Sequence, residues 1–298
     1  MNPSRVDETP SELGAFAPFG EFDETLDSAE SIGVDSGATL VKLCIRQSGG
    51  ELNFATWPSP SRDRVLAMLE RLAPERLGIT GCGALGVLGG LSREAASPVE
   101  FDAWGRGANE MLEHLGLASD APYLLVSIGT GTSALRVEGD RVERVGGTAL
   151  GGGTALGLGL VLTNCRSHEE LAMMAARGER GRVDLLISDV YPDSDIPLAA
   201  EATASSFGKL ARSPDQSPRH EDLAAAIMGL VAENIALLST AQARAAGVSR
   251  IVYGGSTLND NTRIIETVRL LGAVMGVESI VLPDSGHVGA LGSMLLGR

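Results

Sequence analysis

The sequence predicts an α/β protein built from two related halves. Residues 31–57 and 122–146 each read as three strands separated by glycine-containing turns, with β-branched and apolar residues between the turns. Helix-like and strand-like segments alternate after each copy, as expected of sheets covered by helices. A glycine-rich turn follows the first strand of each copy, and such turns offer backbone N–H groups to a phosphate. We therefore expect a mixed sheet flanked by helices in each half, with a nucleotide between the halves.

The remaining elements follow from hydrophobic periodicity and from glycine punctuation. The apolar positions of 221–246 recur at helical spacing, and this helix is expected to end at Gly247, a natural C-cap. The other expected elements are helices over 61–73, 103–116 and about 259–275, strands over 76–80, 250–256 and 279–283, and a last glycine-punctuated helix.

Charge separates a tail from the body of the chain. Residues 1–30 carry eight acidic side chains against Arg5 alone, so we interpret them as an acidic, flexible extension outside the folded protein. The first half is then expected over 31–120. The second half, with a helical insertion, is expected over 121–298.

Composition excludes several classes of function. A formal net charge of -14 disfavours binding to nucleic acid or to an anionic membrane. No apolar stretch reaches the roughly 18 residues that a membrane span needs, and a signal-like N-terminus is lacking, so we expect a cytoplasmic enzyme. Cys44, Cys82 and Cys165 lack metal-ligand spacing and are interpreted as buried free thiols.

Familiar nucleotide and hydrolase motifs are weak or lacking. GCGALG, residues 81–86, matches the dinucleotide fingerprint, but a strand meander precedes it, so we interpret it as a tight turn beside the active site. Gly208-Lys209 is followed by Leu210, which excludes a Walker-type phosphate loop. The sequence also has neither H-E-x-x-H nor G-x-S-x-G.

The strongest chemical signal is the turn that follows the first strand. Asp35-Ser36-Gly37-Ala38-Thr39, with Lys42 beyond it, supplies a carboxylate for Mg²⁺, amide donors, a hydroxyl and a cation. An ordinary hairpin turn could have the same sequence. The second turn, Gly129-Thr130-Gly131-Thr132-Ser133, favours phosphoryl transfer over that alternative.

DSGATLVK resembles the first phosphate loop of the actin, hexokinase and heat-shock ATPase superfamily, and within it the chain resembles the type II pantothenate kinases. The resemblance covers residues 31–297, and its most specific parts are ERVGGTALGGGTALGLG and TASSFGKL. VEFDA, VSIGTGTS and IVYGGSTLNDN follow in the family's order and spacing.

This resemblance implies a fold and an activity. The fold would consist of duplicated actin-like, ribonuclease H-like halves with ATP in the cleft between them. The activity would be ATP- and Mg²⁺-dependent phosphorylation of pantothenate to 4'-phosphopantothenate, the first step of coenzyme A biosynthesis, in a homodimer. Helix 221–246 would be a candidate dimer surface or equally intramolecular core. The alternatives are a kinase acting on pantetheine or an amino sugar, and a catalytically weak nucleotide-binding regulator.

The resemblance also assigns roles to acidic and basic residues. Glu100 matches the general base that takes the proton of the pantothenate hydroxyl. Asp102, two positions on, is expected to point the other way along an extended segment, so we choose Glu100. Arg144 matches the arginine that grips the pantothenate carboxylate. Asp35 would act on Mg²⁺ through water, and Lys42 on phosphate.

Further residues carried over by the resemblance line the acceptor or the nucleotide. Thr130 and Ser133 match hydroxyl positions in the acceptor pocket. The phosphate and ATP side comprises Asp35, Ser36, Gly37, Thr39, Lys42, Gly129, Thr130, Gly131, Gly151, Gly152, Gly153 and Gly255.

Two departures from the family pattern stand out. Ala38 replaces a usual glycine, and a positive φ there would cost about 1 kcal/mol or more. That cost is the support for a weakly active regulator. Gly286-His287 replaces a more usual apolar or small pair, and we expect a structural role for His287.

Overall fold

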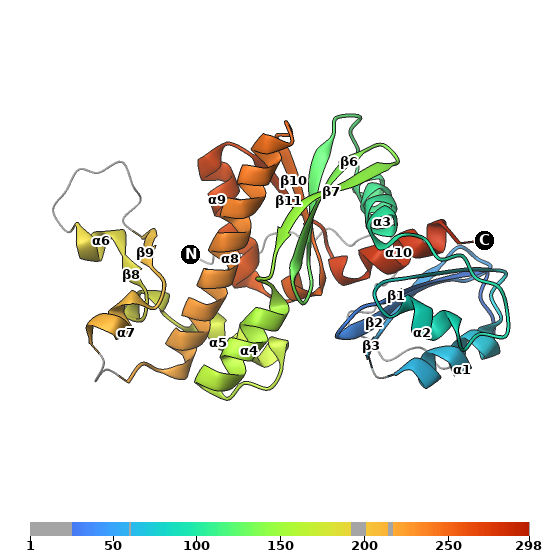
Figure 1. Cartoon of the computed structure of the whole chain (residues 1–298), viewed down its shortest axis with the longest axis horizontal. Coiled ribbons are helices and arrows are strands. Elements are labelled where there is room, and N and C mark those ends of the chain that lie inside the picture. The colour runs from blue at the N-terminus through green and yellow to red at the C-terminus, as the bar shows by residue number, and fades with distance from the viewer. Residues whose placement is uncertain (1–25, 60, 192–200, 214–216, 298) are drawn as a thin grey trace, which may run out of the picture. The chain divides into compact units, whose positions relative to one another are not determined.

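The computed structural model of the chain describes residues 26–59, 61–191, 201–213 and 217–297 (Figure 1). The described chain forms two compact units. Unit 1 consists of the described residues of Met1–Ala118 and His287–Arg298, and unit 2 of those of Ser119–Gly286. The division falls between Ala118 and Ser119. The end of the chain differs from the expectation, because residues from His287 onward belong to the first unit.

Unit 1 contains a four-stranded mixed sheet in the order β3-β2-β1-β4. Strand β1 pairs antiparallel with β2 and parallel with β4, and β2 pairs antiparallel with β3. A parallel bridge between Gly78 of β4 and Ala96 lies at the open edge. The strands are β1 (Ser31–Ser36), β2 (Leu40–Arg46), β3 (Leu52–Pro58) and β4 (Arg76–Thr80).

Helices cover both faces of this sheet because successive strand residues point to opposite sides. Ile32 and Val34 of β1 share a buried cluster with Val65 and Leu69 of the first helix. Gly33, between them, faces the last helix, where its backbone meets that of Ala290. The helices of unit 1 are α1 (Arg62–Leu72), α2 (Ala84–Leu88), α3 (Glu100–His114) and α10 (Val288–Leu295).

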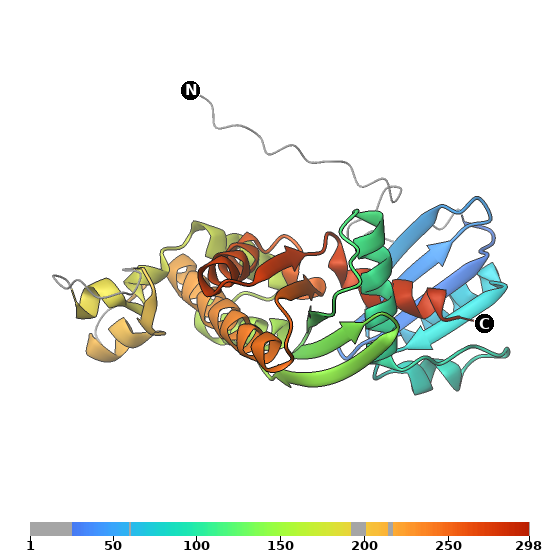
Figure 2. The same cartoon turned by 90° about the horizontal axis from the view of Figure 1, so that it is seen from above.

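Glycines allow α10 to approach both the sheet and α3, and both views show α10 beside α3 (Figures 1 and 2). A Cβ atom on Gly78 would lie 1.9 Å from the Ser293 carbonyl oxygen, and one on Gly292 would lie 1.7 Å from that of Ala103. No side chain fits at such distances. The late-sequence helix is therefore an integral part of the first unit's core.

Unit 2 repeats the same plan. Its five-stranded sheet has the order β11-β10-β5-β6-β7, in which β5, β6 and β7 pair antiparallel while β10 joins β5 and β11 in parallel. This matches the order and direction of unit 1, where the Ala96 bridge stands in place of the fifth strand. The predicted duplication is confirmed. The strands are β5 (Tyr123–Ile128), β6 (Thr132–Glu138), β7 (Arg141–Thr148), β10 (Arg250–Gly254) and β11 (Glu278–Val281).

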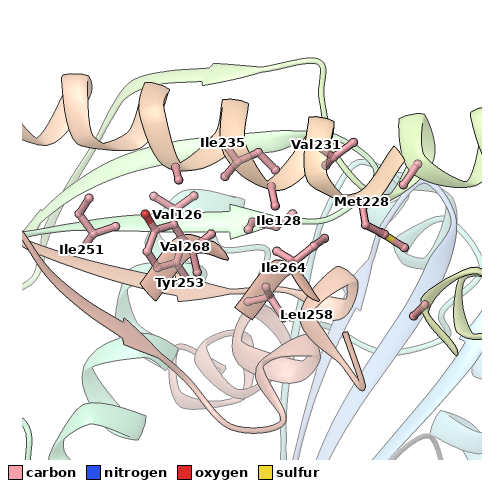
Figure 3. Packing of buried hydrophobic residues seen from close by; sticks show 14 of the residues in the cluster. Val126, Ile128, Met228, Val231, Ile235, Ile251, Tyr253, Leu258, Ile264 and Val268 are labelled. Carbon is pink, nitrogen blue, oxygen red and sulfur yellow. The ribbon is translucent and has the colours of Figure 1, made fainter. Parts of the chain in front are cut away.

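The core of unit 2 lies between this sheet and its helices. Ile235 and Val231 of the long helix α8 pack against Val126 and Tyr253 of the strands and Val268 of α9 (Figure 3). The main helices are α4 (Gly152–Thr163), α5 (His168–Arg177), α8 (His220–Ala245) and α9 (Thr262–Met275). Short elements between α5 and α8 form the insertion, namely η1 (Arg180–Arg182), β8 (Leu185–Leu186), α6 (Ile187–Val190), β9 (Thr203–Ser205) and α7 (Gly208–Arg212).

Helix α8 ends as its sequence predicts. Gly247 adopts a φ of 69°, and the Val248 N–H bonds to the Ala243 carbonyl in the manner of a Schellman motif. Among the described residues, α8 is the one helix long and apolar enough to cross a membrane, and 72% of its most apolar 18-residue window is buried inside the protein. Much of its apolar surface thus belongs to the core of unit 2.

The folded part of unit 1 begins before residue 31. Leu26 and Ala29 are buried in the same cluster as Ile32, and the Glu30 backbone bonds to Arg46 and Arg76. We expected the flexible extension to end at residue 30, but the folded part of unit 1 already includes Leu26. The rest of that extension, residues 1–25, lies outside the described residues.

Candidate active site

A buried ion pair lies where β1 reaches its end. Asp35 and Lys42 are opposite each other in the β1–β2 pairing, and the Lys42 Nζ is 3.7 Å from the Asp35 Oδ2. Burial raises the pKa of Asp35, while the Lys42 charge and hydrogen bond oppose that rise. Sequence reasoning named both residues, and the sheet register brings them together.

The turn after Asp35 closes without strain at Ala38. The Gly37 N–H bonds to the Leu40 carbonyl at 3.0 Å, and the Ser59 hydroxyl donates to the Gly37 carbonyl at 2.6 Å. The described non-glycine residues with positive φ do not include Ala38. The expected cost of a methyl group here does not arise. Ala38 and Thr39 are exposed, as a ligand-contacting turn requires.

The GCGALG segment packs directly on the same turn. Gly81 has a φ of 92°, and a Cβ there would lie 2.5 Å from the Ser36 carbonyl oxygen and 2.8 Å from the Asp35 Oδ1. The Gly83 N–H donates to the Ser36 carbonyl at 2.8 Å. These glycines form the tight turn that we expected, in contact with the Asp35 segment. Cys82 between them is exposed, which corrects its interpretation as a buried thiol; all three cysteines are free.

Glu100 is the first residue of α3, so the expected extended conformation of VEFDA is wrong. Its side chain is exposed at the surface, with protein close enough behind the carboxylate for desolvation to raise its pKa. The charge of Asp35 raises it further, and that of Lys42 lowers it. Glu100 therefore lies within electrostatic range of the Asp35–Lys42 pair.

The helix also corrects the reason for preferring Glu100 over Asp102. Two residues on an extended strand share a face, so that argument would have failed. On a helix, positions two apart lie roughly 200° apart around the axis, and their side chains diverge. The side chains of Glu100 and Asp102 therefore leave the helix on different sides.

In unit 2, the second glycine turn is held by backbone hydrogen bonds. The Gly129 N–H bonds to the Gly131 carbonyl, and the Gly129 carbonyl accepts from the Gly152 N–H at 2.8 Å. The Gly153 N–H bonds to the Thr130 carbonyl at 3.0 Å. The turn and the start of α4 therefore form one rigid backbone cluster, which brings together the two predicted groups of glycines.

Gly255 and Thr257 complete this cluster. Gly255 has a φ of 120°, and a Cβ on it would lie 2.2 Å from the Ile128 carbonyl oxygen. The Thr257 hydroxyl donates to the Gly129 carbonyl at 3.0 Å. Sequence reasoning named Gly255 and missed Thr257, although the hydroxyl stands in the IVYGGSTLNDN motif that carried the resemblance.

Arg144 owes its orientation to a β-bulge. Ser133 pairs with Gly147 and Ala134 with Gly146, but Leu135 pairs with Arg144, so Val145 is the extra residue. Without it, Arg144 would face Arg136 on the other side of the ribbon. With it, Arg144 lies opposite Leu135, and residues opposite each other share a face. Leu135 and Ser133 are two positions apart on the same strand, so Arg144 also shares a face with Ser133. A Cβ on Gly147 would lie 2.9 Å from an Arg144 guanidinium nitrogen, which places the cation beside Ser133's partner.

The TASSFGKL motif lies in the insertion, at β9 and α7. Phe207 adopts a φ of 58°, and its N–H donates to the buried Asp184 carboxylate at 2.9 Å. Lys209 pairs with Asp189 and donates to the Gly181 carbonyl. These contacts hold the insertion together within unit 2.

No group of three or more His, Cys, Asp or Glu side chains that could hold a metal ion occurs in the described part of the chain. A single buried carboxylate is nevertheless a suitable partner for Mg²⁺, which usually keeps several waters and takes its other ligands from substrate phosphates. Asp35 fits that description.

The duplicated sheets with a glycine turn in each unit define the fold of the actin-like ATPases and sugar kinases. Two solved structures share this fold. The activator of the 2-hydroxyisocaproyl-CoA dehydratase from Clostridium difficile with bound ADPNP aligns over 89% of this chain and 93% of its own, with a TM-score of 0.61 and 18% identity. A ROK family glucokinase from Streptomyces griseus in complex with glucose and AMPPNP aligns over 90% and 99%, with a TM-score of 0.54 and 16% identity.

Sequence comparison identifies the family. The model of the family described as Fumble matches residues 99–296. The type II pantothenate kinase of Oceanobacillus iheyensis is 34% identical over 89% of this chain and 98% of its own length. Those of Staphylococcus saprophyticus and Staphylococcus aureus are 32% and 30% identical, over 89% and 90% of this chain and 99% of their own lengths. The chain therefore belongs to the Fumble family and to the family of these type II pantothenate kinases.

Proposed function

We propose that this chain is an ATP-dependent pantothenate kinase, which forms 4'-phosphopantothenate in the first step of coenzyme A biosynthesis. The observation that carries the proposal is the match to type II pantothenate kinases over nearly the full length of both proteins. ATP as donor is supported by the ATP analogues bound to neighbours of the same fold. We further propose that the protein works in the cytoplasm as a homodimer.

The first turn of unit 1 would bind the transferred phosphate. The Gly37 segment offers backbone N–H groups, Ser36 and Thr39 offer hydroxyls, and Lys42 offers a cation. Mg²⁺ bound with ATP would neutralise charge on the phosphate oxygens, and Asp35 would hold it through water. In unit 2, the Gly129–Gly131 turn, Gly151–Gly153 and Gly255 would bring backbone close to the nucleotide without a Cβ clash.

Glu100 would act as the general base. Its carboxylate would accept the proton of the pantothenate primary hydroxyl as the hydroxyl oxygen attacks the γ-phosphorus and ADP leaves. Two observations support this role: the side chain is open to solvent at the start of α3, and its pKa responds to Asp35 and Lys42. Proximity to the phosphate-binding pair is the first condition for a base that acts on the attacking hydroxyl.

Arg144 would bind the pantothenate carboxylate, with Thr130 and Ser133 lining the same pocket. The guanidinium is exposed on β7, and the bulge at Val145 places it on the Ser133 face. A planar guanidinium suits a bidentate grip on a carboxylate. Pantetheine and amino sugars lack that carboxylate, so Arg144 favours pantothenate over both alternatives. A weakly active regulator loses its support because Ala38 is unstrained.

The test is a coupled ADP-release assay of the full chain against pantothenate, pantetheine and an amino sugar. We expect the highest kcat/KM with pantothenate and dependence on added Mg²⁺. Highest activity on pantetheine or the amino sugar would transfer the assignment to that acceptor. ATP binding without turnover on any acceptor would favour the regulator.

A further inference from the structure

Four polar residues form a row across the sheet of unit 1. The pairing registers place Thr56 opposite Lys42, Lys42 opposite Asp35, and Asp35 opposite Thr80. Residues opposite each other share a face, so one side chain from each of β3, β2, β1 and β4 joins the row. Residues 287–289 cover this face, because the His287 Nε2 lies 2.9 Å from the Thr56 hydroxyl and Gly289 contacts Asp35.

Thr80 connects this row to the segment that precedes Glu100. It is 1% exposed at the end of β4, and its hydroxyl donates to the Pro98 carbonyl at 2.9 Å. Two residues before Pro98, Ala96 also binds β4, because it exchanges backbone hydrogen bonds with Leu77 and Ile79. The Thr80 hydroxyl makes the last of these contacts, two residues before Glu100.

The start of α3 has no side-chain cap of its own. Its N-cap residue, Val99, cannot accept a hydrogen bond through its side chain, and the first backbone bond of the helix joins the Ala103 N–H to the Val99 carbonyl. An uncapped helix start frays readily. The direction in which the Glu100 side chain points therefore depends on how the segment before α3 is held.

We propose that Thr80 is a positioning residue for Glu100, which it aligns with Asp35 by fixing the Pro98 carbonyl. The proposal rests on the proposed function, in which Glu100 accepts the proton of the substrate. Thr80 touches neither substrate nor nucleotide in this role. Thr80 can act in this way because it makes two connections. It pairs with Asp35 in the sheet, and its hydroxyl bonds to the segment that leads into α3.

The test uses the variants Thr80→Val and Thr80→Ser in the full chain. Valine keeps the shape and removes the donor, so kcat should fall about 10-fold or more, as small misplacements of catalytic groups do, with the KM for ATP nearly unchanged. Serine keeps the hydroxyl and should restore kcat to within about 2-fold. Thr267→Val is the matched control, because that hydroxyl donates to the Arg263 carbonyl within α9, a helix of unit 2. It should leave kcat unchanged.

A double-mutant cycle separates positioning from general damage. In the Glu100→Gln background the base is already lost, so Thr80→Val should reduce kcat by less than about 2-fold. Equal losses in both backgrounds would overturn the inference, as would a Thr80→Val variant with the kcat of the unmodified protein.

Hydrogen exchange at residues 96–103 supplies a readout that does not depend on turnover. Exchange should become faster in Thr80→Val than in Thr80→Ser, and equal rates would overturn the inference. If the unmodified chain failed to phosphorylate pantothenate, the proposed function would fall, while the exchange rates would still decide whether Thr80 holds the entry to α3.

Discussion

The ammonium nitrogen of Lys42 lies 3.7 Å from a carboxylate oxygen of Asp35, and both side chains are buried. Neither charge would be tolerated there alone, because removing a partner leaves an uncompensated buried charge. The two charges also act in opposite directions on Glu100. Asp35 raises the pKa of Glu100 and Lys42 lowers it, after desolvation, which raises it most.

A pH dependence of the rate follows. A general base works only when ionised, and the pKa of Glu100 is raised above the ordinary value of 4.5. The kcat should therefore fall as pH decreases, with a midpoint above that of an ordinary glutamate. The pH profile of kcat measures this directly. A rate that stays flat through pH 4.5 in a folded enzyme would contradict the role of Glu100.

Glu100→Gln should lower kcat by roughly 10²- to 10⁴-fold, the usual contribution of a positioned acid or base. Glutamine keeps the shape and removes the proton acceptor, so binding of ATP should remain nearly intact. Steady-state kinetics and nucleotide binding give the two numbers. Asp102→Asn is the control, since that side chain leaves the helix on a different side. Abolished turnover in Asp102→Asn with a nearly normal Glu100→Gln would show that the base is misassigned.

Arg144→Ala should raise the KM for pantothenate strongly while changing the KM for ATP little, because the lost contact is to the acceptor carboxylate. Activity on pantetheine, which has no carboxylate, should suffer less. The comparison needs both acceptors and one ATP series. Equal losses for the two acceptors would remove the carboxylate role from Arg144.

Two glycine-to-alanine changes in helices should have opposite effects on stability. A Cβ on Gly292 would lie 1.7 Å from the Ala103 carbonyl oxygen, so Gly292→Ala should destabilise unit 1 by about 3 kcal/mol or prevent folding. Gly157 in α4 has open space around it, and Gly157→Ala should stabilise unit 2 by about 0.5–1 kcal/mol. Denaturant unfolding measures both. Similar stabilities for the two variants would show that α10 packs less closely than described.

The N-terminal boundary can be tested by comparing a chain that starts at Leu26 with one that starts at Ser31. The shorter chain loses the buried side chains of Leu26 and Ala29 and the Glu30 hydrogen bonds. It should be less stable by about 2 kcal/mol or more, the cost of removing a buried leucine. Equal melting temperatures would restore the boundary at residue 30.

The sequence predicted most of the strands and long helices because their signals are local. Alternation between turns identified 31–57 and 122–146, and Gly247 marked the end of α8. The start of α3 was missed because Val99 gives no capping signal. The contacts of α10 could not be predicted, since they depend on glycines such as Gly33 and Gly292 meeting backbone far away in the sequence.

Part of the candidate site could likewise be predicted from the sequence, and part depends on contacts between distant residues. The resemblance supplied the residues, and the sheet register explains why Asp35 and Lys42 meet. The bulge at Val145 depends on pairing between strands, and no local pattern marks the extra residue. The exposure of Cys82 likewise follows from packing of its glycine neighbours on Ser36 rather than from its own apolar character.

The position of α10 in unit 1 has a consequence for biosynthesis. A ribosome makes the chain up to Ala118 first, then all of unit 2, and only afterwards the helix that covers Gly33, Gly78 and Gly107. Domains that are continuous in sequence can fold as they emerge. Unit 2 can do so here, whereas the face of β1 that carries Asp35 stays uncovered until translation reaches Val288 and beyond. A nascent chain of this protein thus assembles its later unit before it can complete its earlier one.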